Sequence, residues 1–279
     1  MNSVRLTILV DNVAQNGCLG EHGFAMCIEL GDRRILMDTG QGSALAANIQ
    51  VLGLESVPFD DLVLSHGHYD HTGAVPWVLS HASGSQLWCH PGVVEPRYSI
   101  RNGEVRNISM PPASRRVLGN LPASRLRWST GPVFLAPGVG LTGAIPRRTD
   151  FEDPGGSFFL DPHGHRPDPV EDDQALWIET DRGLVVCVGC CHAGLINTLS
   201  YVRDLSGGRS ILAVVGGLHL GAAGPDRLER TVSLLRDFNP EMLLACHCTG
   251  EEAVSRLRSG LDCQVLTGYA GMRLDMSRS

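Results

Sequence analysis

The chain has 279 residues, of which 43% are hydrophobic and 19% charged, a composition typical of a soluble globular protein with a large core. No stretch approaches the roughly 18 consecutive apolar residues that span a bilayer, and the N-terminus leads into a strand-like run rather than a signal peptide. We therefore expect a cytoplasmic protein that does not bind membranes. The formal net charge is -7 and all 23 basic residues are arginines, which excludes lysine-dependent catalysis and disfavours nucleic acid as a partner.

Apolar runs and turn residues predict a strand-rich beginning of the chain. The elements expected there are strands at 4–10, 24–30, 34–38 and 62–65, with a helix at 43–53 between the last two. Ser43 is a candidate N-cap for this helix, because its hydroxyl can accept a hydrogen bond from the first helical turn. The strand at 62–65 leads directly into a cluster of histidines.

The middle and the end of the chain differ in regularity. From about residue 82 to 170 the sequence is rich in Pro, Gly and Arg, so we expect short strands at 86–89 and 133–136 joined by long irregular loops. After residue 174 strands and helices alternate: strands at 175–180, 184–189, 210–215, 241–245 and 263–266, and helices at 194–205, 225–238 and 250–260. This order predicts a single α/β domain over residues 1–279, with two sheets packed face to face, helices outside, and an arginine-rich lid or insertion at about 90–170.

The strongest functional signal is a run of four potential metal ligands within six residues. His66, His68, Asp70 and His71 follow the apolar strand at 62–65. A tight loop can direct the first two histidines to one ion and the other two residues to a second, and imidazole with carboxylate suits zinc or iron(II). We therefore expect a metal site at the end of this strand.

More distant histidines are needed to complete such a site. His192 and His247 each follow an apolar strand and precede a helix, which is the sheet edge where α/β proteins place their ligands. His219 has the same kind of position. It is a candidate ligand, proton donor or substrate contact, and an ordinary buried histidine is an equally good interpretation.

The motif His66-x-His68-x-Asp70-His71 resembles the signature of the metallo-β-lactamase-fold hydrolase superfamily. Further matching segments cover nearly the whole chain: Asp11-Asn12, Glu21-His22-Gly23, Asp38-Thr39-Gly40-Gln41, Thr142-Gly143-x-Ile145-Pro146-Arg147, Asp173-Gln174-Ala175, Gly189-Cys190-x-His192-Ala193-Gly194, Gly216-Gly217-x-His219-Leu220 and His247-Cys248-Thr249-Gly250. Together they resemble the branch of dihydropterin-ribofuranosylaminobenzene phosphate synthase-like proteins. The resemblance implies a four-layer αββα sandwich with a metal site at the edge between the sheets.

The resemblance leads to a hypothesis for two metal ions, zinc first and manganese or iron as alternatives. One ion is held by His66, His68 and His192, and the other by Asp70, His71 and His247.

The family resemblance also implies that Asp38 hydrogen-bonds a ligand histidine. Two departures from the superfamily pattern put one ion in doubt. Residues 138–143 replace the usual third-motif histidine segment, and Cys190 stands where a bridging aspartate is usual. Cys190 is either a thiolate ligand or, as we favour, a small buried side chain beside the site.

Other cysteines and histidines are assigned no metal role. Cys246 and Cys248 flank His247, and strand alternation predicts that both point away from it, so we do not expect a soft-metal site there. His163 and His165 are expected in a solvated loop.

Nine arginines lie between 97 and 148, a local excess of positive charge that suits an anionic small molecule. Most of them are expected to be ordinary surface residues. Arg147 is the preferred substrate contact, because the family motif supports it, and His22 is a weaker one.

These residues favour a metal-dependent hydrolase that uses a metal-activated water on a small anionic ester, lactone or phosphoester. In this scheme Asp70 is both ligand and catalytic residue, and His219 protonates the leaving group. Two alternatives stay open: a metal-dependent transferase that joins a dihydropterin methyl group to an aminobenzene-ribose phosphate, and a metal- or ligand-binding protein without catalysis. A homodimer is expected only because dimers are common.

Overall fold

The computed structural model describes residues 4–55 and 58–276, which form two compact units. The first unit comprises Met1–Pro96, Ile108–Trp128 and Gly268–Ser279, and the second comprises Arg97–Asn107 and Ser129–Thr267. Each unit contains its own seven-stranded mixed sheet. The single domain expected over residues 1–279 stays a prediction.

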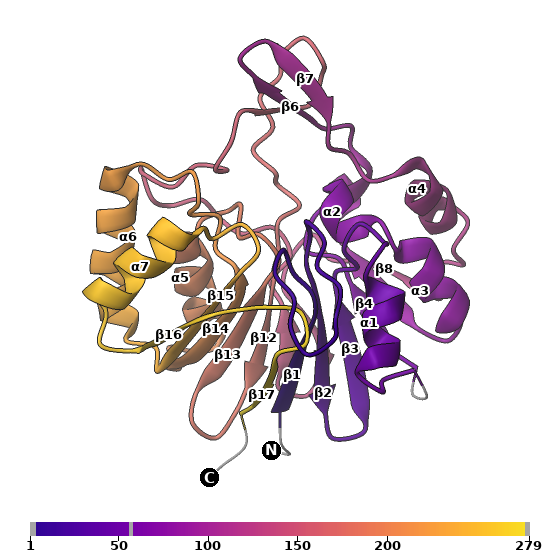
Figure 1. The fold of residues 1–279 in the computed structure, drawn as a ribbon, viewed down its shortest axis with the longest axis horizontal. Helices are drawn as coiled ribbons and strands as arrows, with labels where there is room; N and C mark the ends of the chain where they lie inside the picture. The colour runs from indigo at the N-terminus through magenta and orange to yellow at the C-terminus, as the bar shows by residue number, and fades with distance from the viewer. Residues whose placement is uncertain (1–3, 56–57, 277–279) are drawn as a thin grey trace. The chain divides into compact units, whose positions relative to one another are not determined.

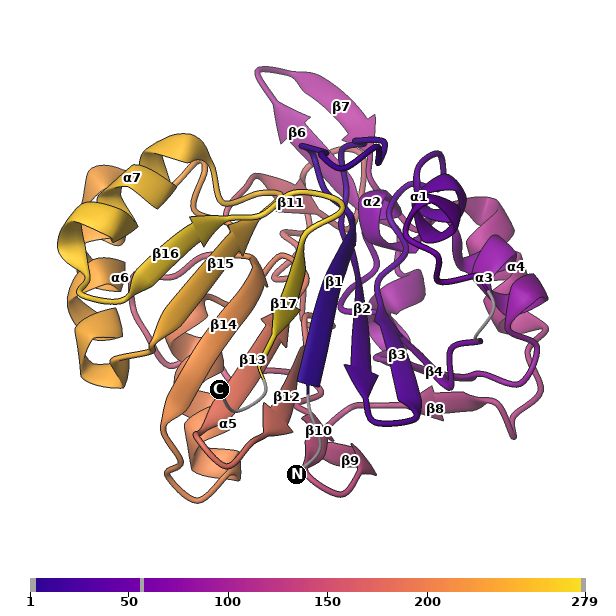
Figure 2. The same cartoon turned by 60° about the horizontal axis from the view of Figure 1, so that its bottom comes forward.

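The sheet of the first unit is antiparallel on one side and parallel on the other (Figure 2). Its strands, in spatial order, are β17 (Arg273–Asp275), β1 (Val4–Val10), β2 (Ala25–Leu30), β3 (Arg33–Met37), β4 (Asp61–Val63), β5 (Gln86–Cys89) and β8 (Leu126–Trp128). The pairs from β17 to β3 are antiparallel and those from β3 to β8 parallel. The carboxyl ends of β3 and β4 therefore lie at the same edge, where Asp38 and the histidine cluster begin.

Four short helices belong to the first unit: α1 (Leu45–Val51), α2 (Tyr69–Thr72), α3 (Val75–His81) and α4 (Pro112–Gly119), with a 3-10 turn at Pro91–Val94. Apolar residues of α1, α3 and α4 pack on one face of the sheet, and the shared core includes Leu36, Ile49, Leu62, Val78 and Leu118. This burial of apolar side chains is the main term that stabilises such short helices.

The start of α1 differs from the expected one. The helix begins at Leu45, and the side chain of Ser43 does not cap it. Glu21, from a preceding loop, instead fixes the turn before the helix, because its carboxylate accepts hydrogen bonds from the amides of Gln41, Gly42, Ser43 and Ala44. All four amides precede Leu45, so Glu21 places a negative charge near the N-terminus of α1 without bonding the N–H groups of its first turn.

The sheet of the second unit has the same division into an antiparallel and a parallel half (Figure 1). Its strands, in spatial order, are β16 (Gln264–Thr267), β15 (Met242–Cys246), β14 (Ile211–Gly217), β13 (Leu184–Val188), β12 (Ala175–Glu179), β10 (Val139–Leu141) and β9 (Val133–Ala136). The pairs from β13 to β16 are parallel, which brings the carboxyl ends of β13, β14 and β15 to one edge.

The helices α5 (Leu195–Leu205), α6 (Pro225–Phe238) and α7 (Glu251–Gly260) pack against this second sheet. The core between them includes Val186, Leu199, Val214, Leu235 and Leu257, all almost completely buried. Among the described residues no helix combines the length and the apolar character needed to cross a bilayer.

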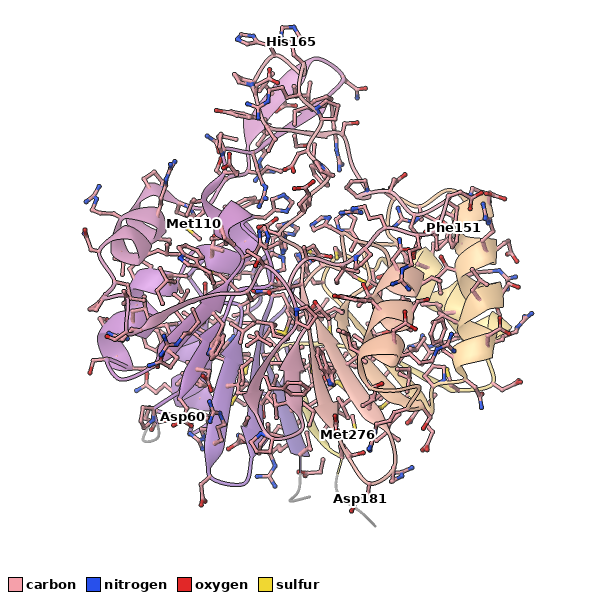
Figure 3. The ribbon with its side chains drawn as sticks, turned by 180° about the vertical axis from the view of Figure 1, so that it is seen from behind. Asp60, Met110, Phe151, His165, Asp181 and Met276 are labelled. Atoms are coloured by element: carbon pink, nitrogen blue, oxygen red, sulfur yellow. The ribbon has the colours of Figure 1, made fainter. Side chains whose placement is uncertain are left out.

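The segment 90–170 contains more regular structure than its composition suggests. Besides α4 and β8 to β10 it forms a small sheet of β6 (Tyr98–Arg101), β7 (Glu104–Asn107) and β11 (Phe158–Phe159). His165 lies at the outer end of this part of the second unit (Figure 3). The irregular loops expected here are therefore only partly present, because hairpin pairing orders a stretch whose short apolar runs give little signal.

Candidate metal centre

The predicted site residues follow strands whose carboxyl ends share an edge in their own unit. In the first unit Asp38 follows β3, and the His66 to His71 cluster follows β4 and continues into α2. In the second unit the parallel strands β13, β14 and β15 lead into His192, His219 and His247. Side chains needed for chemistry thus come together without interrupting either sheet.

One buried carboxylate orients histidines of the first unit. Asp38 is completely buried, and its two oxygens accept hydrogen bonds from the amide and the hydroxyl of Ser65, each at 2.7 Å. Its Oδ2 also lies 2.7 Å from Nδ1 of His71. Because an ionised carboxylate only accepts, Nδ1 of His71 carries the proton, and its Nε2 becomes the ligand atom.

The same network fixes the ring of His66. Nδ1 of His66 lies 2.9 Å from the Ser65 hydroxyl oxygen, whose one proton goes to Asp38. Nδ1 of His66 must therefore donate, which leaves the lone pair on Nε2. The ring centroids of His66 and His71 are 4.3 Å apart, so both oriented imidazoles belong to one cluster.

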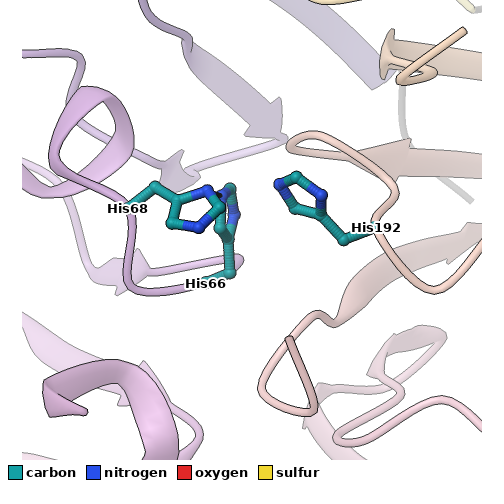
Figure 4. Close-up of side chains that lie close together, drawn as sticks. All are labelled: His66, His68 and His192. Carbon is teal, nitrogen blue, oxygen red and sulfur yellow. Dashed lines mark hydrogen bonds between the residues drawn. The ribbon is translucent and has the colours of Figure 1, made fainter. Parts of the chain in front are cut away.

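His66 and His68 present a pair of nitrogens suited to one metal ion (Figure 4). Nε2 of His66 lies 2.9 Å from Nδ1 of His68. Two histidine nitrogens on a tetrahedral zinc ion, each at about 2.0–2.1 Å, are about 3.3 Å apart. The two rings thus need to open by only a few tenths of an ångström to admit a metal, and the donors present fit such an ion.

Asp70 and His22 form the outer part of the first unit's cluster. Asp70 is buried in the first turn of α2, and its Oδ2 lies 3.1 Å from Nε2 of His22. The His22 side chain is 55% exposed, so it lies between a predicted ligand and solvent.

In the second unit the ring of His192 is held by main-chain groups. Nδ1 of His192 lies 2.7 Å from the carbonyl oxygen of Pro154, to which it donates, so that Nε2 is again the ligand atom. The carbonyl of His192 accepts a hydrogen bond from Arg147 at 2.8 Å, and the amide of Ala193 donates to Asp173 at 2.7 Å. Figure 4 shows His192 on the loop that follows its strand.

Three residues at this edge have backbone conformations that side chains rarely adopt. Cys191, His219 and His247 have φ values of +60°, +48° and +50°. Each such non-glycine residue costs on the order of 1–3 kcal/mol, and such strain concentrates at functional sites. The turns direct the His219 and His247 side chains back into the cluster, and the His192 and His219 rings lie 4.2 Å apart.

The structure corrects the expectation for Cys248. The strand β15 ends at Cys246, so the alternation of side chains stops before Cys248. Its thiol lies 3.4 Å from that of Cys190, and these two sulfurs form a possible metal-ligating group with His247.

Cys248 and His219 influence each other's protonation. Burial raises the pKa of the Cys248 thiol, but the Cys190 thiol and the imidazoles of His219 and His247 bring this pKa well below its ordinary value. Burial lowers the pKa of His219, but Cys248 and the backbone of Gly155 outweigh it, and the net pKa is raised. The raised pKa favours the protonated form of His219, which is the form that donates a proton.

Asp173 is a buried titratable residue to which sequence reasoning assigned no role. It is 2% exposed, and burial raises its pKa to about 7, although the Ala193 amide, Arg147 and His219 counteract this. Its Oδ1 has no hydrogen-bond partner within the described part of the chain. The available signal was its place in Asp173-Gln174-Ala175, one of the segments that match the family.

The arginines of the 97–148 segment serve largely within the fold. Arg97 is 2% exposed and pairs with Asp168 and Asp172, at 2.9 Å and 2.5 Å. Arg147 donates to the carbonyls of His192, Pro169 and Val170. A substrate contact by Arg147 stays a prediction.

The predicted site residues thus form one group in each unit. His22, Asp38, His66, His68, Asp70 and His71 gather in the first unit, and Cys190, His192, His219 and His247 in the second. The assignment of His192 and His247 to particular ions stays a prediction. His163 and His165 are exposed and belong to neither group.

Comparison with known proteins identifies the family. The profile described as the Metallo-beta-lactamase superfamily matches residues 20–186. The uncharacterized protein MJ0448 of Methanocaldococcus jannaschii is 31% identical over 257 residues, covering 90% of this chain and 93% of that protein. From the same organism, 7,8-dihydropterin-6-methyl-4-(beta-D-ribofuranosyl)-aminobenzene-5'-phosphate synthase is 27% identical over 245 residues, covering 84% and 82% of the two chains.

A solved structure agrees with this. Tm1679, described as a metal-dependent hydrolase of the β-lactamase superfamily, is 29% identical and covers 99% of this chain and 100% of its own, with a TM-score of 0.83. The predicted fold class, mixed sheets flanked by helices as in the metallo-β-lactamase fold, is confirmed. The chain belongs to the metallo-β-lactamase superfamily.

Proposed function

We propose that this protein is a metal-dependent hydrolase acting on a small anionic ester, lactone or phosphoester. One observation carries the proposal: Nε2 of His66 and Nδ1 of His68 face each other at 2.9 Å, and the Ser65 and Asp38 network fixes the ring of His66. Such prior orientation of ligand atoms is typical of catalytic metal sites.

The proposed ligand sets draw on both units. His66, His68 and His192 hold one ion, and Asp70, His71 and His247 hold the other, with zinc the preferred metal and manganese or iron the alternatives. The hydrogen bonds of His71 to Asp38 and of His192 to Pro154 support these sets, because each leaves Nε2 as the ligand atom. The ions, when bound, supply an acidified water and polarise the oxygen of the scissile carbonyl or phosphoryl group.

The remaining roles belong to side chains around the ligands. His219, with its raised pKa, donates a proton to the leaving group. Asp70 is ligand and base, and the half-exposed His22 beside it is a substrate contact. Arg147 binds the anionic part of the substrate in this proposal, although three backbone carbonyls also accept from its guanidinium.

A second candidate function is group transfer. It is favoured by the similarity to the M. jannaschii synthase, which covers most of both chains. In that case the same metal ligands would position a dihydropterin methyl carbon and an aminobenzene-ribose phosphate, with loss of a phosphate leaving group. Fold similarity alone does not choose between the two reactions.

Metal analysis followed by an activity screen tests the proposal. Protein purified without a chelating tag is analysed for metal beside the His71→Ala variant, with His81→Ala as control, because His81 is exposed and stacks on Trp77. We expect about two equivalents of zinc, manganese or iron in wild type and control, and at most about one in His71→Ala.

The loaded protein is then offered aryl esters, lactones and phosphoesters. Hydrolysis that needs the metal and disappears in His71→Ala supports the hydrolase. Loaded protein that hydrolyses none of them but joins a dihydropterin whose methyl carbon carries a phosphate leaving group to an aminobenzene-ribose phosphate, with release of that group, establishes the transferase. Wild type that binds no metal overturns both and leaves a binding protein.

A further inference from the structure

Two cysteines from non-adjacent strands meet in the second unit. Cys190 follows β13 and Cys248 follows β15, and β14 lies between these strands in the sheet. Their sulfur atoms are 3.4 Å apart, and neither cysteine forms a disulfide. A disulfide would place the sulfurs at about 2.05 Å, so this is a pair of reduced thiols in contact.

Gly217 at the end of the intervening strand makes this contact possible. A Cβ at position 217 would lie 2.7 Å from the Cys248 sulfur and 3.5 Å from Cα of Cys190. The 2.7 Å to the Cys248 sulfur and the 2.6 Å to the carbonyl oxygen of Gly189 leave no room for a side chain, whereas the distance to Cys190 is an ordinary contact. The absence of a side chain at Gly217 therefore gives the Cys248 thiol its place beside Cys190.

The turn that carries Cys248 is fixed by hydrogen bonds. The Thr249 hydroxyl donates to the carbonyl of Cys246 at 2.7 Å and accepts from the amide of Leu218 at 3.0 Å. The carbonyl of Cys248 accepts from the amide of Gly221 at 3.2 Å. The position of the thiol is thus determined by the backbone around it and not by its contact with Cys190 alone.

His247 adds an imidazole to the two sulfurs. One ligand atom from each of Cys190, His247 and Cys248 lies within 4.8 Å of the others. Cys190 also belongs to a second such group, with His192 and His219. Two thiolates on a tetrahedral zinc ion, each at about 2.3 Å, are about 3.8 Å apart, so the observed 3.4 Å needs only a small opening.

We propose that Cys190, His247 and Cys248 form a thiolate-rich metal site in the second unit, suited to zinc or iron(II). Each thiol releases its proton to solvent as its sulfur binds the metal, and His247 binds through a neutral nitrogen. The inference rests on the metal binding of the proposed function but not on its reaction. The ion assigned to His247 then has two sulfur ligands. From the sequence, Cys190 was the one candidate thiolate ligand, and a buried side chain beside the site was the favoured interpretation.

Cobalt(II) is a direct probe, because thiolate-to-cobalt charge transfer absorbs in the near ultraviolet and imidazole or carboxylate ligands do not give this band. Reduced, metal-free protein is titrated with cobalt(II) alone. The set comprises wild type, Cys190→Ser, Cys248→Ser, the double variant and Cys263→Ser. The control Cys263 precedes β16 and so lies at the amino ends of the parallel strands, whereas Cys190 and Cys248 lie at their carboxyl ends.

We expect a charge-transfer band in wild type and Cys263→Ser, about half its intensity in each single variant, and none in the double variant. A band of wild-type intensity in Cys190→Ser or Cys248→Ser overturns the proposal. Cobalt binding without a charge-transfer band also overturns it. The proposed function would survive that result, because its histidine and aspartate ligands do not give this band.

A measurement on wild type alone guards against variants that do not fold. Alkylation of the reduced protein is followed by peptide mass spectrometry, with and without zinc. Zinc should slow the modification of Cys190 and Cys248 at least about tenfold and leave Cys263 unchanged. Equal rates with and without zinc, in protein that binds the metal, overturn the thiolate site.

Discussion

The two units present their histidines at equivalent edges of similarly built sheets, but they fix the rings differently. In the first unit one side chain, Asp38, binds His71 directly and His66 through Ser65. In the second unit the ring of His192 is held by a backbone carbonyl, and His219 and His247 are placed by positive φ angles. The histidine group of the first unit is therefore sensitive to one side chain, and that of the second unit to main-chain geometry.

A glutamate lies near the start of the helix that follows each edge. Glu21 accepts hydrogen bonds from amides of the turn before α1, whereas Glu152 accepts those of Ile196 and Asn197 in the first turn of α5. Each carboxylate lies against a glycine, Gly40 in the first unit and Gly194 in the second. Each unit thus places a glutamate against a glycine ahead of a helix, but only Glu152 caps the helix itself.

Removal of the Asp38 carboxylate should have the largest effect. Asp38→Ala leaves the buried amide and hydroxyl of Ser65 and Nδ1 of His71 without their acceptor, which should cost about 3 kcal/mol of unfolding free energy. Metal affinity should fall about 10- to 100-fold, because the rings of His66 and His71 lose their orientation. Urea unfolding and zinc titration measure the two effects.

A matched pair of variants tests whether this dependence belongs to the first unit. Asp38→Asn keeps one acceptor oxygen, and asparagine tolerates the observed φ of +60°. The stability and metal affinity of this variant should therefore lie between those of wild type and Asp38→Ala. Arg147→Ala removes the donor to the carbonyls of His192, Pro169 and Val170 but leaves the acceptor of the His192 ring in place, so it should change metal affinity less. Equal losses of metal affinity in Arg147→Ala and Asp38→Ala would contradict the comparison.

The two glycines at the helix starts test the importance of main-chain geometry. Gly194 has φ +98° and ψ 140°, a region open only to glycine, and an added Cβ would lie 2.6 Å from Cβ of Glu152. Gly194→Ala should therefore cost about 2–3 kcal/mol of unfolding free energy. Gly40 has φ +66°, which alanine tolerates better, but an added Cβ would press on the carboxylate end of Glu21 and lie 2.9 Å from Cγ1 of Val10, so Gly40→Ala should cost about 1–2 kcal/mol.

Denaturation in urea gives both values. Gly53→Ala is the control, because Gly53 has φ +68° but nothing within 4 Å of an added Cβ, so it isolates the cost of the backbone conformation. If Gly194→Ala is no more destabilising than Gly53→Ala, the close contact with Glu152 does not constrain the second unit.

The sequence predicted the strand ends well, because long apolar strands and the turns after them are local features. The strands at 4–10 and 184–189 and the helices at 194–205 and 225–238 agree with the structure within one or two residues. This placed His192 and His247 correctly at the carboxyl ends of β13 and β15.

The sequence did not predict the shortest helices or the contacts between residues that are far apart in the chain. The helix α2 has four residues and α3 has seven, too few for a helical period to be visible. The strand β17 exists through its pairing with β1, some 270 residues away, and Cys248 meets Cys190 because β15 ends at Cys246. Such contacts follow from the fold and not from neighbouring residues.

The buried carboxylate of Asp173 should give the stability of the second unit a pH dependence. Burial raises the pKa of Asp173 from 3.8 to about 7, so between these values the native state holds a proton that the unfolded chain has lost. The unfolding free energy should therefore fall as pH rises through this range, by at most about 1.4 kcal/mol per pH unit.

Asp173→Asn removes this titration. In urea unfolding of metal-free protein between about pH 5 and pH 7, the unfolding free energy of the variant should decline less steeply with pH than that of wild type. Any other buried carboxyl affects both proteins alike. The same slope in both proteins would show that Asp173 is ionised throughout.

The smallest effect on stability is expected for His22, the exposed end of the first unit's cluster. Its Nε2 lies 3.1 Å from Oδ2 of Asp70, but the His22 side chain is 55% exposed, and water screens such a pair. His22→Ala should therefore shift the unfolding free energy by less than about 0.5 kcal/mol. If His22 contacts the substrate, KM rises while kcat and bound metal stay as in wild type. A loss of bound metal in His22→Ala would instead mean that this exposed histidine holds Asp70 in place, so that the first unit depends on its outer edge as well as on Asp38.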